Sequence, residues 1–297
     1  MSLVEKAMRK VQAAAADARP PAEELAILEP ADLAQAAFVD RRNAPSRAVC
    51  TGVAISLDRV ALLAEGLTPP QQEERQIAEQ FRQIKRPLVT RALTPPDKAG
   101  AVSSPRVIAV TSALPGEGKT FTSLNLALSL AMERDLNVLL VDGDVAKAHL
   151  SRLAGLAGEP GLLDAIQLPG IDIESLVHAT DTPHLAVLGA GQRSDRSTEM
   201  LASRRMSELL AMLVANDPTR VVVMDCPPLL LTNESRVVMG LAGQVLVVVK
   251  SGKTAQRDVV EALTHVPPGR AIGLVLNQSL SKNSAGYYGY HLNDRAS

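Results

Sequence analysis

Residues 107–120 read VIAVTSALPGEGKT, and this stretch decides the fold. Its first part, Val107 to Thr111, is a continuous apolar run that predicts a buried strand. A loop containing two glycines follows, and behind Thr120 the sequence continues in a helical pattern. A strand, a glycine-containing loop and a helix in this order are the context that a phosphate-binding loop requires.

In such a loop each residue type has a physical role. Gly116 and Gly118 let backbone N–H groups close around phosphate oxygens, and the N-terminus of the helix adds a favourable dipole. Lys119 can reach the β and γ phosphates, and Thr120 can offer its hydroxyl to Mg²⁺. Ala113 stands where the strict motif has its first glycine, so we expect a different entry geometry. A tight turn with a chance lysine is the alternative, which the flanking strand and helix disfavour.

Two further apolar runs end in aspartates. Asp142 and Asp144 follow the run 138–141, and Asp225 follows the run 221–224. Because the carboxyl ends of parallel strands open on one crevice, we expect these carboxylates beside the phosphate loop. A lone aspartate there is more often a cap or turn residue, but three beside a phosphate loop favour a magnesium site. Asp142 or Asp144 could also accept the proton of an attacking hydroxyl.

The alternation of apolar runs with helical segments predicts the fold class. Continuous apolar runs suit strands that helices cover on both faces. We therefore predict an α/β fold, a doubly wound and mostly parallel sheet of the P-loop NTPase type with a helical N-terminal extension. The predicted strands are 107–111, 138–141, 185–188, 221–224, 245–249 and 272–276, and the predicted helices are 119–133, 197–215, 233–241 and 255–265.

The chain divides into four predicted parts. Residues 1–70 form a weakly structured or helical extension, with an amphipathic helix at 2–17 that docks on its own domain or on a partner. Residues 71–104 form a helix and a linker that serve oligomer contact. Residues 105–280 form the ATPase or kinase domain, and residues 281–297 form a flexible tyrosine-containing tail.

Composition narrows the function classes. The 297 residues carry a formal net charge of -1, which with the missing basic stripe argues against nucleic acid as a partner. Two cysteines in unlike contexts fit a reducing cytoplasm. No apolar run approaches the ~20 residues that span a bilayer. All three tyrosines, Tyr287, Tyr288 and Tyr290, fall within four consecutive positions near the end.

These motifs resemble the Walker A, A′ and B motifs of bacterial protein-tyrosine kinases, a group within the MinD/ParA-like P-loop superfamily. Over about residues 70–291 the chain looks most like the exosortase-associated tyrosine autokinases of exopolysaccharide systems. The matching segments are Pro115–Thr120, Asn125–Ala127, Asp142–Asp144 and Asp225–Pro228, with Ser2–Lys10, Glu79–Pro87, Thr198–Ser203 and Gly286–His291 narrowing the match.

The resemblance implies a site that binds ATP and Mg²⁺. The implied catalytic residues are Lys119, Asp142 and Asp144. The implied metal ligands are Thr120, Asp144 and Asp225. The implied nucleotide-binding residues are Pro115, Gly116, Glu117, Gly118, Lys119, Thr120, Phe121 and Asn277.

The resemblance also implies autophosphorylation between subunits. In the family each subunit's tail enters its neighbour's active site in a ring, so Tyr287, Tyr288 and Tyr290 become phosphoacceptors. A helix with Glu79, Arg82 and a third basic residue makes the family's ring contact, and Lys85 holds that third place. The implied activator is a membrane polysaccharide co-polymerase, or chain-length determinant protein. The chain would regulate exopolysaccharide synthesis or export from the cytoplasmic side of the inner membrane, through that partner and without a span of its own.

Two other interpretations stay open. A MinD/ParA-like ATPase switch would bind a membrane partner without kinase activity, but such ATPases carry a signature lysine where Leu114 stands. A regulatory subunit without catalysis is the second, and the complete set of phosphate and metal ligands disfavours it.

Overall fold

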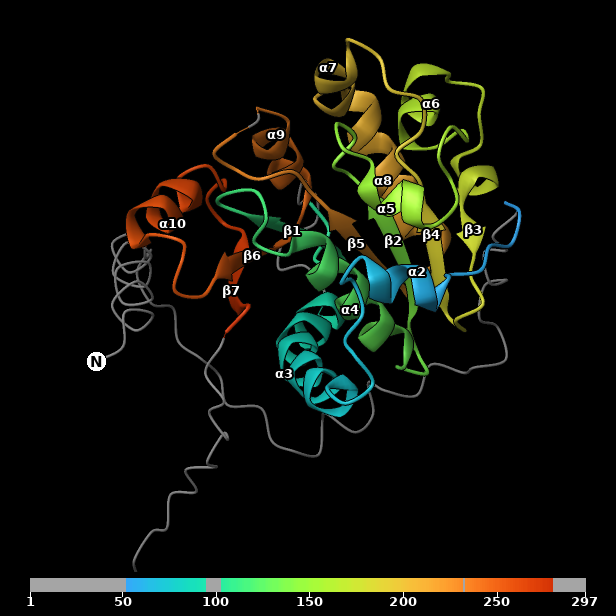
Figure 1. Ribbon diagram of the computed structural model, residues 1–297. Coiled ribbons are helices and arrows are strands. Elements are labelled where there is room, and N and C mark those ends of the chain that lie inside the picture. The colour runs from blue at the N-terminus through green and yellow to red at the C-terminus, as the bar shows by residue number, and fades with distance from the viewer. Residues whose placement is uncertain (1–51, 95–102, 232, 280–297) are drawn as a thin grey trace, which may run out of the picture.

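The computed structural model describes residues 52–94, 103–231 and 233–279, and a seven-stranded sheet forms its centre (Figure 1). The strands are β1 (Val107–Ser112), β2 (Asn137–Asp142), β3 (His178–Ala179), β4 (Leu185–Leu188), β5 (Arg220–Asp225), β6 (Gln244–Lys250) and β7 (Ala271–Asn277). Their order across the sheet is β3-β4-β2-β5-β1-β6-β7. All pairs are parallel except the short β3, which runs antiparallel to β4.

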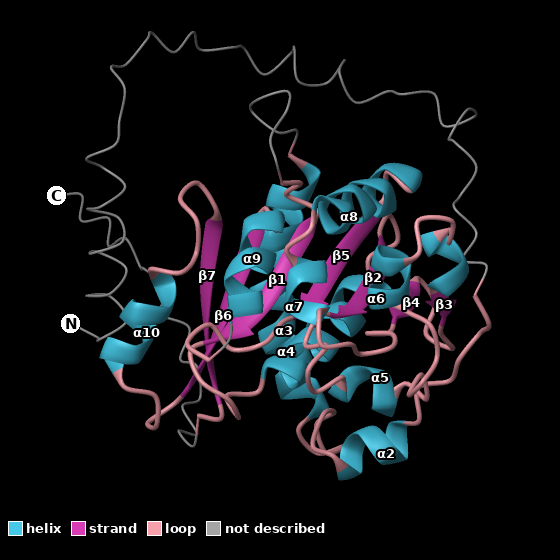
Figure 2. Cartoon of the chain, turned by 90° about the horizontal axis from the view of Figure 1, so that it is seen from above, coloured by secondary structure: helices cyan, strands magenta, loops and turns pink. Residues whose placement is uncertain are grey.

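Helices cover both faces of the sheet (Figure 2). One face packs against α2 (Arg59–Ala64), α3 (Glu74–Leu93), α4 (Lys119–Ala131) and α5 (His149–Leu153). The other packs against α6 (Leu162–Gln167), α7 (Ser197–Leu201), α8 (Arg204–Asn216), α9 (Asn233–Leu241) and α10 (Gln256–Leu263), with the 3₁₀ helix η2 (Ile173–Leu176) beside them. Within the described ranges, none of the helices combines the length and apolar content needed to cross a membrane.

The predicted fold class is confirmed, and its cause is visible in the strands. Every residue of β1 and of β5 is buried, as continuous apolar runs covered on both faces require. All six predicted strands are present within a residue or two of their predicted ends. The short β3 and the short helices α5 and α6 were not predicted, because so few residues carry no readable period.

One predicted helix is two. The stretch 197–215 divides into α7 and α8, because the helical conformation is interrupted at Ala202 and Ser203. Ser203 takes an extended conformation, and its hydroxyl accepts a hydrogen bond from the Met206 N–H at 3.3 Å. A serine N-cap of this kind starts a new helix where apolar periodicity alone shows a continuous one.

The segment before α3 is packed, which corrects the expectation of weak structure up to residue 70. Leu57, Leu62 and Leu67 are buried in the same apolar cluster as the buried side of α4. The Asn125 side chain in α4 also donates to the Leu67 carbonyl at 2.7 Å. Residues 1–51, with the predicted helix at 2–17, lie outside the described residues, as do 95–102 of the predicted linker and the tail from residue 280.

We expect Leu62→Ala to lower the free energy of unfolding by about 2–4 kcal/mol, because it removes a fully packed leucine and leaves a cavity. The next residue gives a matched control, since Leu62 is 3% exposed and Leu63 is 46% exposed. Urea unfolding of both variants measures the difference. Equal losses from Leu62→Ala and Leu63→Ala would show that this segment is not part of the folded unit.

Helix α3 is fastened to its own domain by the residue expected to serve a ring contact. Lys85 is buried, and its ammonium donates to the Ser129 carbonyl at 2.8 Å and pairs with Glu133 at 2.6 Å. Glu79 and Arg82, in contrast, form an exposed ion pair at 2.6 Å. Lys85 therefore connects α3 to α4, and only Glu79 and Arg82 lie on the free surface as a ring contact needs.

Candidate active site

The phosphate loop joins β1 to α4 through two glycines in the left-handed region. Gly116 has a φ of 75°, and Gly118, the N-cap of α4, has a φ of 93°. A side chain at Gly118 would also collide with the amide of Asn277. Only glycine meets both conditions. The loop therefore curls so that helix α4 starts at Lys119 with its free N–H groups facing the loop.

Glu117 holds this loop in shape from inside. Its side chain is 1% exposed, and its carboxylate accepts the Leu114 N–H at 2.7 Å, closing the loop on itself. The other carboxylate oxygen accepts from the Lys250 N–H at 3.2 Å and from the Thr254 hydroxyl. The carboxylate of Glu117 is thus turned away from the position that phosphates would take, and it connects the loop to the residues that follow β6.

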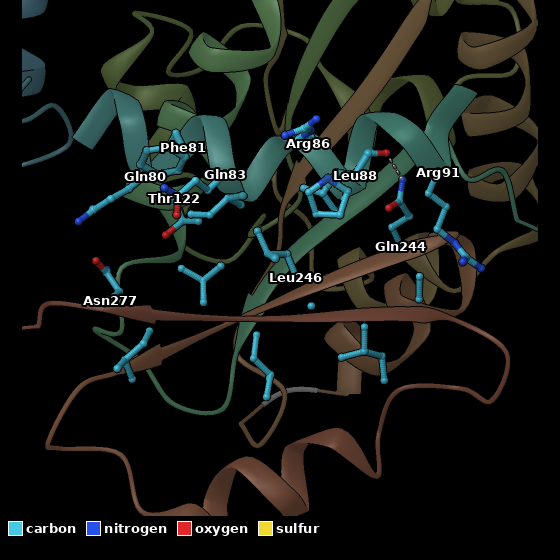
Figure 3. A pocket seen from close by; sticks show the side chains of 18 of the residues that line it. Gln80, Phe81, Gln83, Arg86, Leu88, Arg91, Thr122, Gln244, Leu246 and Asn277 are labelled. Atoms are coloured by element: carbon cyan, nitrogen blue, oxygen red, sulfur yellow. Dashed lines mark hydrogen bonds between the residues drawn. The ribbon is translucent and has the colours of Figure 1, made fainter. Parts of the chain in front are cut away.

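The end of β7 supports the loop from the other side. The Asn277 side chain donates to the Glu117 carbonyl at 2.9 Å, and the Gln278 side chain donates to the Gly116 carbonyl at 3.2 Å. Asn277 also lies at one end of a groove of about 2000 Å³ between α3 and β7, near Thr122 (Figure 3). Phe121 belongs to the same lining. An elongated groove thus opens beside the phosphate loop.

Lys119 and Thr120 turn from the loop toward the carboxylates. Lys119 is 7% exposed, and its charge partly offsets the rise that burial causes in the pKa of Asp225. Thr120 is half-buried and its hydroxyl hydrogen-bonds Asp225. The hydroxyl of Ser123, one turn further along α4, donates to the same carboxylate at 3.1 Å. Helix α4 therefore delivers one cation and two hydroxyls to Asp225.

Asp142 and Asp225 are register partners on neighbouring strands, β2 and β5, and both are almost fully buried. Burial raises the pKa of Asp225 to about 7, and the nearby charge of Asp142 adds to this effect. Burial raises the pKa of Asp142 to about 6, against hydrogen bonds from Ser151. Gly143 keeps the strand ends close, because a Cβ there would meet the Asp225 carbonyl oxygen at 2.9 Å.

One carboxylate oxygen of Asp142 is satisfied and the other is not. Oδ2 accepts the Ser151 N–H at 2.8 Å and the Ser151 hydroxyl at 2.7 Å. Oδ1 is buried and has no hydrogen-bond partner among the described residues. A buried carboxylate oxygen without a partner is costly, so it marks the place where a ligand is expected.

The donor set fits a hydrated Mg²⁺. The described part of the chain has no cluster of three His, Cys, Asp or Glu side chains of the kind that cages a metal ion. Mg²⁺ does not need one, since it keeps several waters and takes one or two carboxylates plus phosphate oxygens. Asp144, 8% exposed, adds a third negative charge that raises the pKa of Asp142 further. A divalent cation would relieve the repulsion among these three carboxylates.

The structure brings most of the predicted site residues together at the carboxyl ends of β1, β2, β5 and β7. Lys119, Thr120 and the three aspartates surround the start of α4, and Asn277 contacts the loop itself. The predicted phosphoacceptors Tyr287, Tyr288 and Tyr290 lie outside the described residues. Sequence reasoning missed Ser123 and Ser151, which no motif marks, although Ser123 lies one turn behind Lys119.

Fold and site together define a P-loop nucleotide-binding protein of the doubly wound α/β class. Known proteins agree: a family model described as an AAA domain matches residues 105–278. Among solved structures, the kinase domain of the Escherichia coli tyrosine kinase ETK has a TM-score of 0.59 and 27% sequence identity to this chain. The alignment covers 72% of this chain and 80% of the ETK chain. The kinase domain of VpsO aligns with 70% and 98%, at a TM-score of 0.56 and 29% identity.

One of two similar curated relatives shows the family. The tyrosine-protein kinase YwqD of Bacillus subtilis is 32% identical over 186 residues, which are 61% of this chain and 77% of YwqD. The succinoglycan biosynthesis transport protein ExoP of Rhizobium meliloti is 31% identical over 198 residues, 65% of this chain but only 24% of ExoP. The chain thus belongs to the bacterial tyrosine-protein kinase family, and it spans about a quarter of its longer relatives.

Proposed function

We propose that this protein is an ATP-dependent protein-tyrosine autokinase that phosphorylates Tyr287, Tyr288 and Tyr290 between subunits. The observation that supports this most is the gathering of Lys119, Thr120 and three buried strand-end aspartates around one phosphate loop. A loose phosphoryl-transfer transition state needs positioning and charge neutralisation, and this arrangement offers both.

Each residue can be given a part. Backbone N–H groups of Gly116, Gly118 and the start of α4 would hold the phosphates, and Lys119 would neutralise charge on the transferred group. Thr120, Asp144 and Asp225 would hold Mg²⁺, which when bound neutralises phosphate charge. The tyrosine oxygen attacks the γ phosphorus and the bond to the β–γ bridging oxygen breaks, so ADP leaves. The hydroxyl proton passes to an aspartate.

Asp142 suits the role of proton acceptor best. Its Oδ2 is already engaged by Ser151, and its Oδ1 is free. A carboxylate whose pKa is raised to about 6 holds a proton more readily than an exposed one, which helps it accept one from a phenol. Asp144 is the second candidate, since it borders the same carboxylates and is slightly more exposed.

The groove beside the loop is a suitable place for the nucleoside. It begins at Phe121, Thr122 and Asn277, where the phosphate loop ends, and its walls mix apolar and amide side chains. Adenine binding sites combine an apolar surface with a few placed polar groups. We therefore assign Phe121 and Asn277 to the nucleoside side of the site.

The wider role follows from the relatives. Those named tyrosine-protein kinases and a succinoglycan biosynthesis transport protein make exopolysaccharide synthesis or export the proposed process. A homo-oligomeric ring, a membrane polysaccharide co-polymerase as activator, and a place at the inner membrane through that partner complete the proposal. Glu79 and Arg82, exposed on α3, are the described residues available for the ring contact.

The test is incubation of the purified protein with MgATP, followed by mass spectrometry of the C-terminal peptide and measurement of released ADP. We expect phosphate on Tyr287, Tyr288 or Tyr290, and no phosphotyrosine in a variant with all three changed to Phe, since the protein has no other tyrosine. The Phe variant should still bind MgATP. ADP release without any modified tyrosine would contradict kinase activity and favour the ATPase switch.

A further inference from the structure

Ser151 makes two hydrogen bonds to one carboxylate oxygen of the site, Asp142 Oδ2, one from its backbone N–H and one from its hydroxyl. The N–H lies 2.8 Å and the hydroxyl 2.7 Å from that oxygen. Ser151 is 3% exposed and lies in the short helix α5, on the turn that follows the two aspartates. Water therefore hardly competes for this contact.

The direction of the hydroxyl proton is fixed by a third partner. The Ser151 oxygen accepts the Ala190 N–H at 2.8 Å, so its single proton is free to point only toward Asp142. Ala190 is itself held, because its carbonyl accepts the Leu163 N–H at 3.0 Å, and the neighbouring Gly189 carbonyl accepts the Leu162 N–H at 2.9 Å. A chain of hydrogen bonds thus connects α6, through the residues that follow β4, to Asp142.

The turn between the aspartates and Ser151 is also closed. The Asp144 carbonyl accepts the Ala148 N–H at 2.7 Å and the Lys147 N–H at 3.0 Å. Gly189 lies beside Ser151, since a Cβ on it would be in ordinary van der Waals contact with the hydroxyl oxygen, at 3.5 Å. Ser151 therefore sits in a rigid frame, and its bonds to Asp142 do not depend on a mobile loop.

We propose that Ser151 is a positioning residue for the reaction: it occupies Oδ2 of Asp142 with two hydrogen bonds, and so reserves the buried, unpartnered Oδ1 for the reactants. The inference rests on the proposed function only in the role given to Asp142. Nothing in the phosphate-loop motif or in the strand-end aspartates assigns a part to Ser151. A hydroxyl is required there, because only a group that both donates and accepts joins Asp142 to Ala190.

The test compares Ser151→Ala, Ser151→Thr and a control, Ser197→Ala. Ser197 is another buried serine, outside the site, and among the described residues its hydroxyl bonds to the backbone of Ser194. The full-length variants are compared in phosphotyrosine formation at saturating MgATP, in the dissociation constant of ADP with and without Mg²⁺, and in melting temperature. Mutation of a residue that orients a metal-site or active-site ligand typically lowers affinity or activity by about 10- to 100-fold.

We expect Ser151→Ala to lower the maximal phosphorylation rate about 10-fold and to reduce the tightening of ADP binding by Mg²⁺. ADP binding without Mg²⁺ should stay within about twofold, because the phosphate loop is untouched. Ser151→Thr, which keeps the hydroxyl, should restore most of the loss, and Ser197→Ala should match the wild type. A loss in the phosphorylation rate or in the Mg²⁺ effect on ADP binding supports the proposal if Ser151→Thr restores the lost property.

The proposal is overturned if Ser151→Ala equals Ser197→Ala in both readouts, or if Ser151→Thr is as impaired as Ser151→Ala. Absence of phosphotyrosine from the wild type would overturn the proposed function instead. The ADP measurements still judge Ser151 in that case, since they do not require phosphoryl transfer.

Discussion

Lys119→Met should abolish phosphotyrosine formation, with a loss of at least about 100-fold in rate. Lys119 is 7% exposed at the first position of α4, beside the glycines of the phosphate loop, and its charge partly offsets the rise that burial causes in the pKa of Asp225. Removing one preorganised group that stabilises charge in the transition state typically costs about 10²- to 10³-fold. Methionine keeps most of the volume and removes the charge, so the loop should stay folded. Quantitative mass spectrometry of the tail after incubation with MgATP measures the loss.

Lys253→Met is the matched control for charge. Lys253 is exposed after β6. Its removal should change the rate by less than about twofold. A Lys119→Met protein that melts like the wild type but keeps more than a tenth of its activity would contradict the position given to Lys119.

Asp225→Asn should have opposite effects on activity and on stability. The carboxylate accepts hydrogen bonds from Thr120 and Ser123 and is proposed to hold Mg²⁺, so activity should fall at least about 100-fold. In the protein without nucleotide and metal, however, burial of this carboxylate next to Asp142 is unfavourable. Asparagine removes that cost, so the variant should have a higher free energy of unfolding than the wild type near pH 8.

The raised pKa of Asp225 sets the direction in which the free energy of unfolding changes with pH. Burial raises the pKa of Asp225 to about 7, above the value of 3.8 for a free carboxyl group, so between about pH 4 and pH 7 the folded state binds more protons than the unfolded state. The wild type therefore loses stability as the pH rises through this range, and Asp225→Asn should lose less, by on the order of 1–4 kcal/mol at pH 8. Urea unfolding from pH 4 to 8 without Mg²⁺ measures this difference.

Asp217→Asn provides the contrasting case. Burial would raise the pKa of Asp217, but hydrogen bonds from Thr219 and Asn137 outweigh it and lower the pKa. Its charged form therefore stabilises the fold at neutral pH, and Asp217→Asn should destabilise where Asp225→Asn stabilises. If Asp225→Asn loses stability at pH 8 as Asp217→Asn does, the claim that Asp225 and Asp142 are buried and repel each other is contradicted.

The parts of the fold and site that could be read from the sequence are local. The phosphate loop is specified by Gly116, Gly118 and Lys119 within a few positions, and a strand buried on both faces announces itself as a continuous apolar run. The convergence of Asp142 and Asp225 follows from one topological rule, since parallel strands end at one edge of the sheet. Register then places the two aspartates side by side.

The parts that could not be read depend on contacts between distant segments. Leu57, Leu62 and Leu67 show no strong period, and they are buried in an apolar cluster that also contains side chains of α3, α4 and α5. The turn of Glu117 inward depends on Lys250 and Thr254, more than 130 positions away. Lys85 reads as a surface charge in its helix, but Ser129 and Glu133 bury it. Single-sequence patterns do not carry such pairings.

The most direct measurement of the central claim is a mixing experiment between two inactive variants. One carries Lys119→Met and keeps its tyrosines, and the other keeps the phosphate loop and has Tyr287, Tyr288 and Tyr290 changed to Phe. Neither should form phosphotyrosine alone. After mixing with MgATP, we predict phosphate on the tail tyrosines of the Lys119→Met chain, because the intact site of one subunit acts on the tail of another. No phosphotyrosine in the mixture, while the wild type is phosphorylated under the same conditions, would contradict transfer between subunits at this site.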